Sequence, residues 1–350
     1  MLHTMLDAWS SLAFSPFAPA LPQAGGEFVA CRYHGESGTL RYKLFIPNGH
    51  DCAPLPLVVM LHGGGQDADD FALGTGMNAL AQEHGCLVAY PEQSASANWG
   101  RCWNWFDDAH HHRGKGEPAL IAALTRQVMA DYAVDPARVY VAGLSAGGAM
   151  AIILGRTYPD LFAAAGSHSG LAHGSATDCH GATLAMRDGA RAWAPACDCA
   201  VSGVPVIVFH GDLDSTVHPD NSLGVVRQII DGQAALSSST ETGQHAGRGF
   251  TRHIHRSHGG RILAEHWTVH GVGHAWSGGN RRGTYTDAGG PDASREMLRF
   301  FLRHANRHPD NDARIFSSKP RTSWTRHVAD AEAQAARGDD RLGGRQFHAG

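Results

Sequence analysis

The sequence predicts an α/β protein with a mainly parallel central sheet and helices on both faces of that sheet. Short continuous apolar runs, such as Leu57–Leu61 and Val206–Phe209, have the length and pattern of strands that are buried on both faces. Segments with helical periodicity separate these runs, and this alternation is typical of parallel sheets covered on both sides. Ligands of such sheets bind beyond the carboxyl ends of the strands, so functional residues are expected directly after each run.

The expected strands follow one another along the middle of the chain. Pro47 closes the first of them, and Pro91 stops the third. In chain order, we expect strands at Arg41–Ile46, Leu57–Leu61, Leu87–Tyr90, Val139–Ala142, Val206–Phe209 and His266–His270.

Four helices are expected between and after these strands. Asp67 is expected to cap one helix that carries Phe71, Met77 and Leu80, and Pro118 suits the first position of the next. The third helix covers residues 146–156, and the last is amphipathic and carries residues 297–302.

The composition sets limits on the class of protein. Among 350 residues, 43% are hydrophobic and 18% are charged, which excludes a globally disordered chain. The net charge of -4 gives no basic footprint for nucleic acid, and no apolar run is long enough to span a membrane. We expect a flexible leader at residues 1–25, a catalytic domain at 26–305 and a polar tail at 306–350.

A nucleophile motif follows the strand at Val139–Ala142. Residues 143–147 read G-L-S-A-G, a G-x-S-x-G pattern between an expected strand and an expected helix. Small residues two positions before and after Ser145 let strand and helix approach closely, and the sharp turn presents the hydroxyl clear of the sheet. We therefore predict that Ser145 is a nucleophile; the alternative is a serine that merely caps the helix.

A serine nucleophile needs a base, and the base needs a carboxylate that orients it. In this context the expected chain order is serine, then Asp or Glu, then histidine. The H-G-D-L-D segment after Val206–Phe209 offers two carboxylates, and we favour Asp214 over Asp212 because it lies far enough along the loop to turn toward the site. His274, in the G-V-G-H-A-W segment after the last strand, fits the position of the base.

Attack on a carbonyl group creates an oxyanion, which two backbone N–H groups are expected to bind. One is the N–H of Ala146, directly after the nucleophile; the other comes from the H-G-G-G segment after the second strand, where we favour Gly64 and then Gly65. Trp276 beside the base, and Trp105 in N-W-G-R-C-W-N-W-F, are candidate substrate-binding residues, with core packing as the alternative.

No metal site is expected. The run His110–His112 is a poor ligand set, since consecutive side chains point in different directions, and we assign it to a polar surface loop. Cys197 and Cys199 form a C-x-C pair without zinc spacing.

Six blocks, in this order, resemble the polyhydroxybutyrate (PHB) depolymerase family of esterases, which also includes feruloyl and acetylxylan esterases. They are LPLVVMLHGGGQ, MNALAQEHGCLVAYPEQ, CWNWFDDAHHHRGKGEPALIAAL, VDPARVYVAGLSAGGAM, VPVIVFHGDLDSTVHP and HWTVHGVGHAWSGG. The resemblance runs from about Phe28 to Ala305. It implies an α/β-hydrolase fold with no cofactor, in which Ser145 is the nucleophile, Asp214 its acid partner and His274 the base.

The resemblance implies a serine carboxylic-ester hydrolase that cleaves short-chain hydroxyalkanoate esters or oligomers through an acyl-enzyme. A feruloyl or acetylxylan esterase is the alternative, and a non-catalytic binding module is disfavoured because all three triad residues are present. The expected partner is an ester or polyester-oligomer substrate, with no nucleic acid and no membrane. The oligomeric state stays open.

Three features depart from the family pattern. The family often has Cys where this sequence has Gly64, paired with the Cys of CWNWF, so Cys102 lacks that partner. The family is commonly extracellular, which implies the same location here; no conventional secretory signal is readable before Arg32, so the cytoplasm is the alternative. The tail is too short and polar for a separate polymer-binding domain, which favours soluble esters or oligomers.

Overall fold

The computed structural model describes residues 25–49, 53–189, 203–231, 233 and 236–306. The predicted leader and tail therefore lie outside the described residues, apart from Gly25 and Asn306 at their inner ends. Cys197 and Cys199 also fall outside them.

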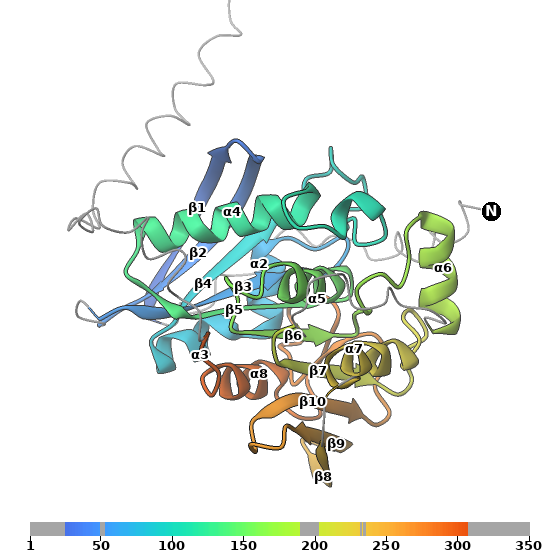
Figure 1. Ribbon diagram of the computed structural model, residues 1–350. Helices are drawn as coiled ribbons and strands as arrows, with labels where there is room; N and C mark the ends of the chain where they lie inside the picture. The colour runs from blue at the N-terminus through green and yellow to red at the C-terminus, as the bar shows by residue number, and fades with distance from the viewer. Residues whose placement is uncertain (1–24, 50–52, 190–202, 232, 234–235, 307–350) are drawn as a thin grey trace, which may run out of the picture.

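In the described part of the chain, one mixed sheet of ten strands has the order β1-β2-β4-β3-β5-β6-β7-β10-β9-β8 (Figure 1). The six central strands from β4 to β10 pair in parallel, and an antiparallel pair extends each edge. The expected α/β-hydrolase fold with a mainly parallel sheet is confirmed. The strands are β1 Gly26–Gly35, β2 Gly38–Pro47, β3 Leu55–Leu61, β4 Leu87–Glu92, β5 Val134–Leu144, β6 Ala164–His168, β7 Val206–Gly211, β8 Ser237–His245, β9 Arg248–Arg256 and β10 Ile262–Val269.

Helices cover both faces of this sheet (Figure 1). The apolar side chains of α4, α5 and α7 join one core cluster, and those of α2, α3 and α8 join the other. Within the described residues, no helix is long and apolar enough to cross a bilayer. The helices are α2 Ala68–Thr75, α3 Met77–His84, α4 Gly116–Asp131, α5 Ala146–Thr157, α6 Cys179–Asp188, α7 Asp220–Ile230 and α8 Ala293–Phe301.

Strand β3 shows why its sequence is continuously apolar. Leu57, Val59 and Leu61 belong to the first core cluster, whereas Val58 and Met60 belong to the second. Successive side chains of a strand point to opposite faces, so a strand covered on both faces needs apolar residues at every position.

Three sequence expectations need correction. The helix expected after Asp67 is two helices: Asp67 caps α2 by accepting a hydrogen bond from Asp70, but Gly76 has a φ of 64° and separates α2 from α3. Pro118 is the third residue of α4, which begins at Gly116. Proline is tolerated there because backbone N–H groups have no partner within the helix anywhere in its first turn, so the N–H that proline lacks is not missed. Pro91 lies inside β4, where it is opposite Tyr42 of β2.

Two short strands lie in the chain segment between β10 and α8. β11 (Trp276–Ser277) pairs in parallel with β12 (Thr286–Asp287) in a sheet of their own. The loop between them, residues 278–285, packs against α2, since Asn280 donates its backbone N–H to the carbonyl oxygen of Gly74 at 2.8 Å. Tyr285 of this loop lines one cavity with Gly63, Leu144 and Thr216, so the loop reaches the edge of the sheet where β3, β5 and β7 end.

Candidate active site

Ser145 occupies a strained turn between β5 and α5. Its φ of 55° and ψ of -119° are rare for a residue other than glycine. A Cβ atom on Gly143 would lie 2.4 Å from the backbone of Gly147, and one on Gly147 would lie 2.1 Å from the carbonyl oxygen of Leu61. These contacts are the physical reason for the two glycines of the motif, because strand, helix and β3 meet there backbone to backbone.

Asp214 follows β7 and is hydrogen-bonded through both carboxylate oxygens. Oδ1 accepts the backbone N–H groups of Thr216 and Val217, both at 2.9 Å, and Oδ2 lies 2.8 Å from Nδ1 of His274. Burial alone would raise the pKa of Asp214, but hydrogen bonds from His210 and His274 hold it well below its usual range. Asp214 is therefore a carboxylate at neutral pH.

Asp212, the alternative carboxylate, faces a different partner. Its Oδ1 accepts the N–H of Gly271 at 2.7 Å, and its Oδ2 lies 2.9 Å from Nδ1 of His270. It thus supports the loop before His274 and does not contact His274. The structure brings Asp214, and not Asp212, to that histidine.

His274 and Ser145 line one cavity of about 90 Å³. Because Nδ1 of His274 donates to the Asp214 carboxylate, Nε2 of the neutral ring is left as an acceptor. The other lining residues are Gly63, Gly64, Leu144, Thr216 and Tyr285.

Backbone hydrogen bonding distinguishes between the two glycines of the H-G-G-G segment that are candidate oxyanion donors. The N–H of Gly65 is already bound to the carbonyl oxygen of Gly100 at 2.8 Å, whereas Gly64 lines the cavity and its N–H has no partner among the described residues. Ala146 is the first residue of α5, so its N–H has no acceptor within the helix. Gly64 and Ala146 are thus the two candidate donors whose N–H groups are available.

Two buried histidines that sequence reasoning did not single out hold these loops. His62 donates from Nδ1 to the carbonyl oxygen of Gly63 and accepts the N–H of Gln93 at Nε2; burial lowers its pKa to about 4. His168 accepts the N–H of Ser277 at Nε2, and burial lowers its pKa to about 3. Only their position could have marked them in the sequence, since His62 directly follows β3 and His168 is the last residue of β6.

The two tryptophans expected at the pocket lie elsewhere. Trp276 is buried, donates from Nε1 to the hydroxyl of Ser294 at 3.0 Å and packs edge-on against Phe71. Trp105 is also buried in the core, and neither tryptophan lines the cavity. The wall beside His274 is formed by Tyr285 from the β11–β12 loop, which sequence reasoning missed because no pattern marks it.

The histidine run also differs from its expected place in a polar surface loop. His111 is buried, and its Nε2 is 2.9 Å from the carbonyl oxygen of Ala176. Cys102 is a free thiol. In the part of the chain that the structure describes, no cluster of three or more His, Cys, Asp or Glu side chains could hold a metal ion.

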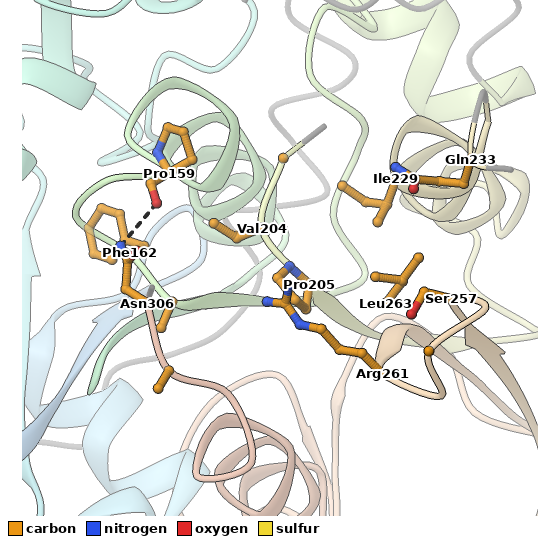
Figure 2. Close-up of a pocket in the computed structure, with 14 residues that line it drawn as sticks. Pro159, Phe162, Val204, Pro205, Ile229, Gln233, Ser257, Arg261, Leu263 and Asn306 are labelled. Atoms are coloured by element: carbon orange, nitrogen blue, oxygen red, sulfur yellow. Dashed lines mark hydrogen bonds between the residues drawn. The ribbon is translucent and has the colours of Figure 1, made fainter. Parts of the chain in front are cut away.

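A larger cavity of about 510 Å³ lies at the opposite edge of the sheet (Figure 2). Its lining includes Ala163, Pro205 and Leu263, which lie where β6, β7 and β10 begin. Among the described residues that line it there is no histidine and no carboxylate, and hence no acid–base pair. The smaller cavity at the carboxyl ends of the strands is the candidate active site.

The fold and this cavity define the class of protein: an α/β-hydrolase with the arrangement of a serine hydrolase. The chain belongs to the family of esterases described as esterase PHB depolymerase, which it matches over residues 40–248. It is 33% identical over 261 residues to poly(3-hydroxyalkanoate) depolymerase C of Paucimonas lemoignei, a match that covers 71% of this chain and 62% of that protein, and so less than two thirds of its length.

Other relatives carry different substrate names. A probable acetylxylan esterase A of Aspergillus clavatus is 28% identical over 239 residues, covering 63% of this chain and 75% of that protein. Among solved structures, acetyl xylan esterase from Aspergillus awamori has a TM-score of 0.60 and 20% identity, over 79% of this chain and all of that one. This structural likeness concerns the fold. The expected resemblance to the PHB depolymerase family is confirmed.

Proposed function

We propose that this protein is a serine carboxylic-ester hydrolase that works through an acyl-enzyme. The observation that carries the proposal is the pairing of Asp214 with His274 at 2.8 Å, together with the cavity that His274 shares with Ser145 and Gly64. A carboxylate that orients an imidazole beside a serine is the arrangement that activates a hydroxyl group.

The proposed first half-reaction forms the acyl-enzyme. Nε2 of His274 takes the proton of the Ser145 hydroxyl as the oxygen attacks the ester carbonyl carbon. The N–H groups of Gly64 and Ala146 bind the oxyanion, and Asp214 stabilises the imidazolium without itself being protonated. The imidazolium gives its proton to the leaving alkoxide, and the alcohol departs.

The second half-reaction uses the same groups with water. His274 takes a proton from water, the hydroxide oxygen attacks the acyl carbon, and the oxyanion returns to the two N–H groups. His274 then returns the proton to Ser145, which releases the carboxylic acid. Neither a metal ion nor a cofactor enters any of these steps.

The proposed substrates are short-chain hydroxyalkanoate esters or oligomers. This choice follows the depolymerase that is 33% identical, and the cavity of about 90 Å³ suits small groups. Acetylated sugars are the second candidate, because an acetyl group is small and several of the relatives are acetylxylan esterases. A feruloyl ester carries an aromatic ring and provides the contrasting substrate.

The decisive experiment replaces the proposed nucleophile. Ser145→Ala should abolish p-nitrophenyl butyrate hydrolysis and labelling by a fluorophosphonate while leaving the fold intact, as measured by circular dichroism. Ser237→Ala, at an exposed serine of β8, is the matched control and should keep both. Full activity in Ser145→Ala would refute the proposal, and an unlabelled wild-type protein would favour a binding module. A panel of hydroxybutyrate oligomers, acetyl-sugar esters and feruloyl esters then identifies the substrate.

An extracellular place of action is also proposed, on the family resemblance alone, with the cytoplasm as the alternative. Comparing esterase activity in the culture medium of the source organism with activity in its lysate tests this point. Activity confined to the lysate would favour the cytoplasm.

A further inference from the structure

Tyr285 has a backbone conformation that aromatic residues rarely adopt. Its φ is 52°, in the left-handed region that favours glycine. The residue lies on the wall of the small cavity, where its ring meets the ring of His274 nearly edge-on, with centroids 6.3 Å apart and planes at 79°. A strained residue at such a place persists only when its surroundings hold it there.

The neighbours of Tyr285 supply that restraint. Asp70 binds Thr284 through both oxygens: Oδ1 accepts its backbone N–H at 2.9 Å, and Oδ2 accepts its hydroxyl. Gln66 donates to Oδ2 of Asp70 at 2.8 Å and to the hydroxyl oxygen of Thr284 at 3.0 Å. On the other side, Trp276 donates its backbone N–H to the carbonyl oxygen of Tyr285 at 2.7 Å.

Gln66 also connects these contacts to the H-G-G-G segment, which is the oxyanion loop. Its Oε1 accepts the backbone N–H of Gly63 at 2.9 Å, one residue before the candidate donor Gly64. The β11–β12 loop and the H-G-G-G segment are therefore held as one unit, and Tyr285 keeps a fixed place relative to the site where the carbonyl oxygen of a substrate would bind.

Among the residues that line the cavity, Tyr285 has the bulkiest side chain and is only half-buried. Leu144 is 1% exposed and belongs to the core, and Gly63 and Gly64 contribute backbone. Removing the tyrosine ring would thus open the cavity toward solvent, whereas removing Leu144 would leave a hole in the core. At about 90 Å³ the cavity has the volume of roughly three water molecules, so the presence or absence of the Tyr285 ring changes which substrate groups it can hold.

The position of His274 indicates which part of an ester meets Tyr285. In the proposed reaction His274 returns its proton to the oxygen of the leaving alcohol, so that oxygen must lie within hydrogen-bond reach of Nε2. A side chain that packs against the His274 ring then borders the alcohol part of the substrate. The acyl part extends from the same carbonyl carbon in the other direction.

We propose that Tyr285 is a specificity-determining residue that limits the size of the leaving alcohol, and that Asp70 is a positioning residue that acts through it. This inference rests on the proposed ester hydrolysis. It assigns to the β11–β12 loop the selection of acyclic alcohols, such as a hydroxyalkanoate unit, over cyclic ones. Among the proposed substrates it therefore favours hydroxyalkanoate esters over acetylated sugars.

The test varies alcohol and acyl groups separately. The alcohol ratio is kcat/KM for cyclohexyl acetate divided by that for ethyl acetate, and the acyl ratio is kcat/KM for ethyl hexanoate divided by that for ethyl acetate, both followed by acid release in a pH-stat. Tyr285→Gly should raise the alcohol ratio at least tenfold, since even one methylene group of misfit in a pocket is worth roughly tenfold or more. The acyl ratio should change less than threefold.

Three further variants sharpen the result. Tyr285→Phe keeps the ring and should keep the wild-type alcohol ratio. Tyr285→Asn, whose side chain tolerates the left-handed region, should raise this ratio as the glycine variant does. Asp70→Ala does not alter the lining of the cavity, but it releases Thr284 and should raise the alcohol ratio by a smaller factor.

Ratios of two kcat/KM values do not depend on the fraction of enzyme that is active, so partial misfolding cannot imitate the effect. An unchanged alcohol ratio in both Tyr285→Gly and Tyr285→Asn, or an acyl ratio that moves as far as the alcohol ratio, overturns the inference. Failure of the proposed function gives a different result, since the wild-type protein would then hydrolyse no ester or Ser145→Ala would remain active.

Discussion

Replacing Asp214 by asparagine tests the central contact of the candidate site with the smallest possible change. The amide keeps one acceptor oxygen. If that oxygen stays on the N–H groups of Thr216 and Val217 at 2.9 Å, the amide NH₂ faces Nδ1 of His274, 2.8 Å away. It must then donate to Nδ1, which moves the ring proton to Nε2, and Nε2 can no longer accept the proton of Ser145.

The opposite amide orientation is no better, because the NH₂ group would meet two backbone N–H donors and leave them without an acceptor. We therefore expect kcat to fall by roughly 10⁴, the loss associated with the wrong histidine tautomer, or about 5 kcal/mol of barrier. The assay is p-nitrophenyl butyrate hydrolysis at pH 7.5, with circular dichroism as the control for folding.

Asp212→Asn is the matched control, since it is also a loop carboxylate that accepts from a backbone N–H and a histidine. It should lose less than tenfold in kcat, because its partners are His270 and Gly271 and not His274. If Asp214→Asn kept more than a tenth of the activity, or if Asp212→Asn fell as far, the assignment of the orienting carboxylate would have to be abandoned.

The remaining predictions concern loop geometry, packing and acid stability. Gln66→Leu removes the acceptor of the Gly63 N–H and should lower kcat by roughly 10- to 100-fold with KM within about threefold; a rise in KM alone would contradict this. Gly147→Ala should lower the free energy of unfolding by more than about 3 kcal/mol because its Cβ would lie 2.1 Å from a backbone oxygen, whereas Gly65→Ala, with φ of 78° and open space, should cost about 1 kcal/mol; equal melting temperatures would refute it. At pH values between their lowered pKa and about 6.5, buried histidines bind fewer protons in the folded protein than in the unfolded chain. The free energy of unfolding therefore falls as the pH decreases, by about 2 kcal/mol per histidine between pH 6.5 and 5. A melting temperature that is flat over this range would contradict the lowered pKa values, which are those of His62, His168, His173 and His266.

The central strands could be predicted from sequence because burial on both faces leaves a plain signal. Strand β6 could not, although it lies between β5 and β7 in the middle of the sheet. Its sequence A-A-G-S-H has no large apolar residue, because α8 packs so closely that a Cβ on Gly166 would lie 2.9 Å from the sulfur of Met297. The antiparallel strands β8 and β9 are largely exposed or half-buried, and their polar sequences resemble loops.

The same distinction applies to the candidate site. Ser145, Asp214 and His274 could be proposed because each follows a recognisable strand in a fixed chain order, and the motif around Ser145 has a steric cause. Tyr285 could not, because its place depends on contacts with α2, more than 200 residues earlier in the chain. Trp276 was misplaced for a related reason: its neighbour His274 faces the cavity, but its own indole packs on Phe71 in the core.

His62 and His168 show how the loops of this site are joined without main-chain pairing. A neutral imidazole carries one donor and one acceptor on a rigid ring, so it can bind a backbone carbonyl with one nitrogen and a backbone N–H with the other. His62 does this between the oxyanion loop and the end of β4, and His168 receives the N–H of Ser277, three residues after His274. Protonation would set an N–H against an N–H in both places. Acid would therefore separate the loops that carry the oxyanion donor and the base, and this requirement explains why both rings are buried so deeply that they stay neutral.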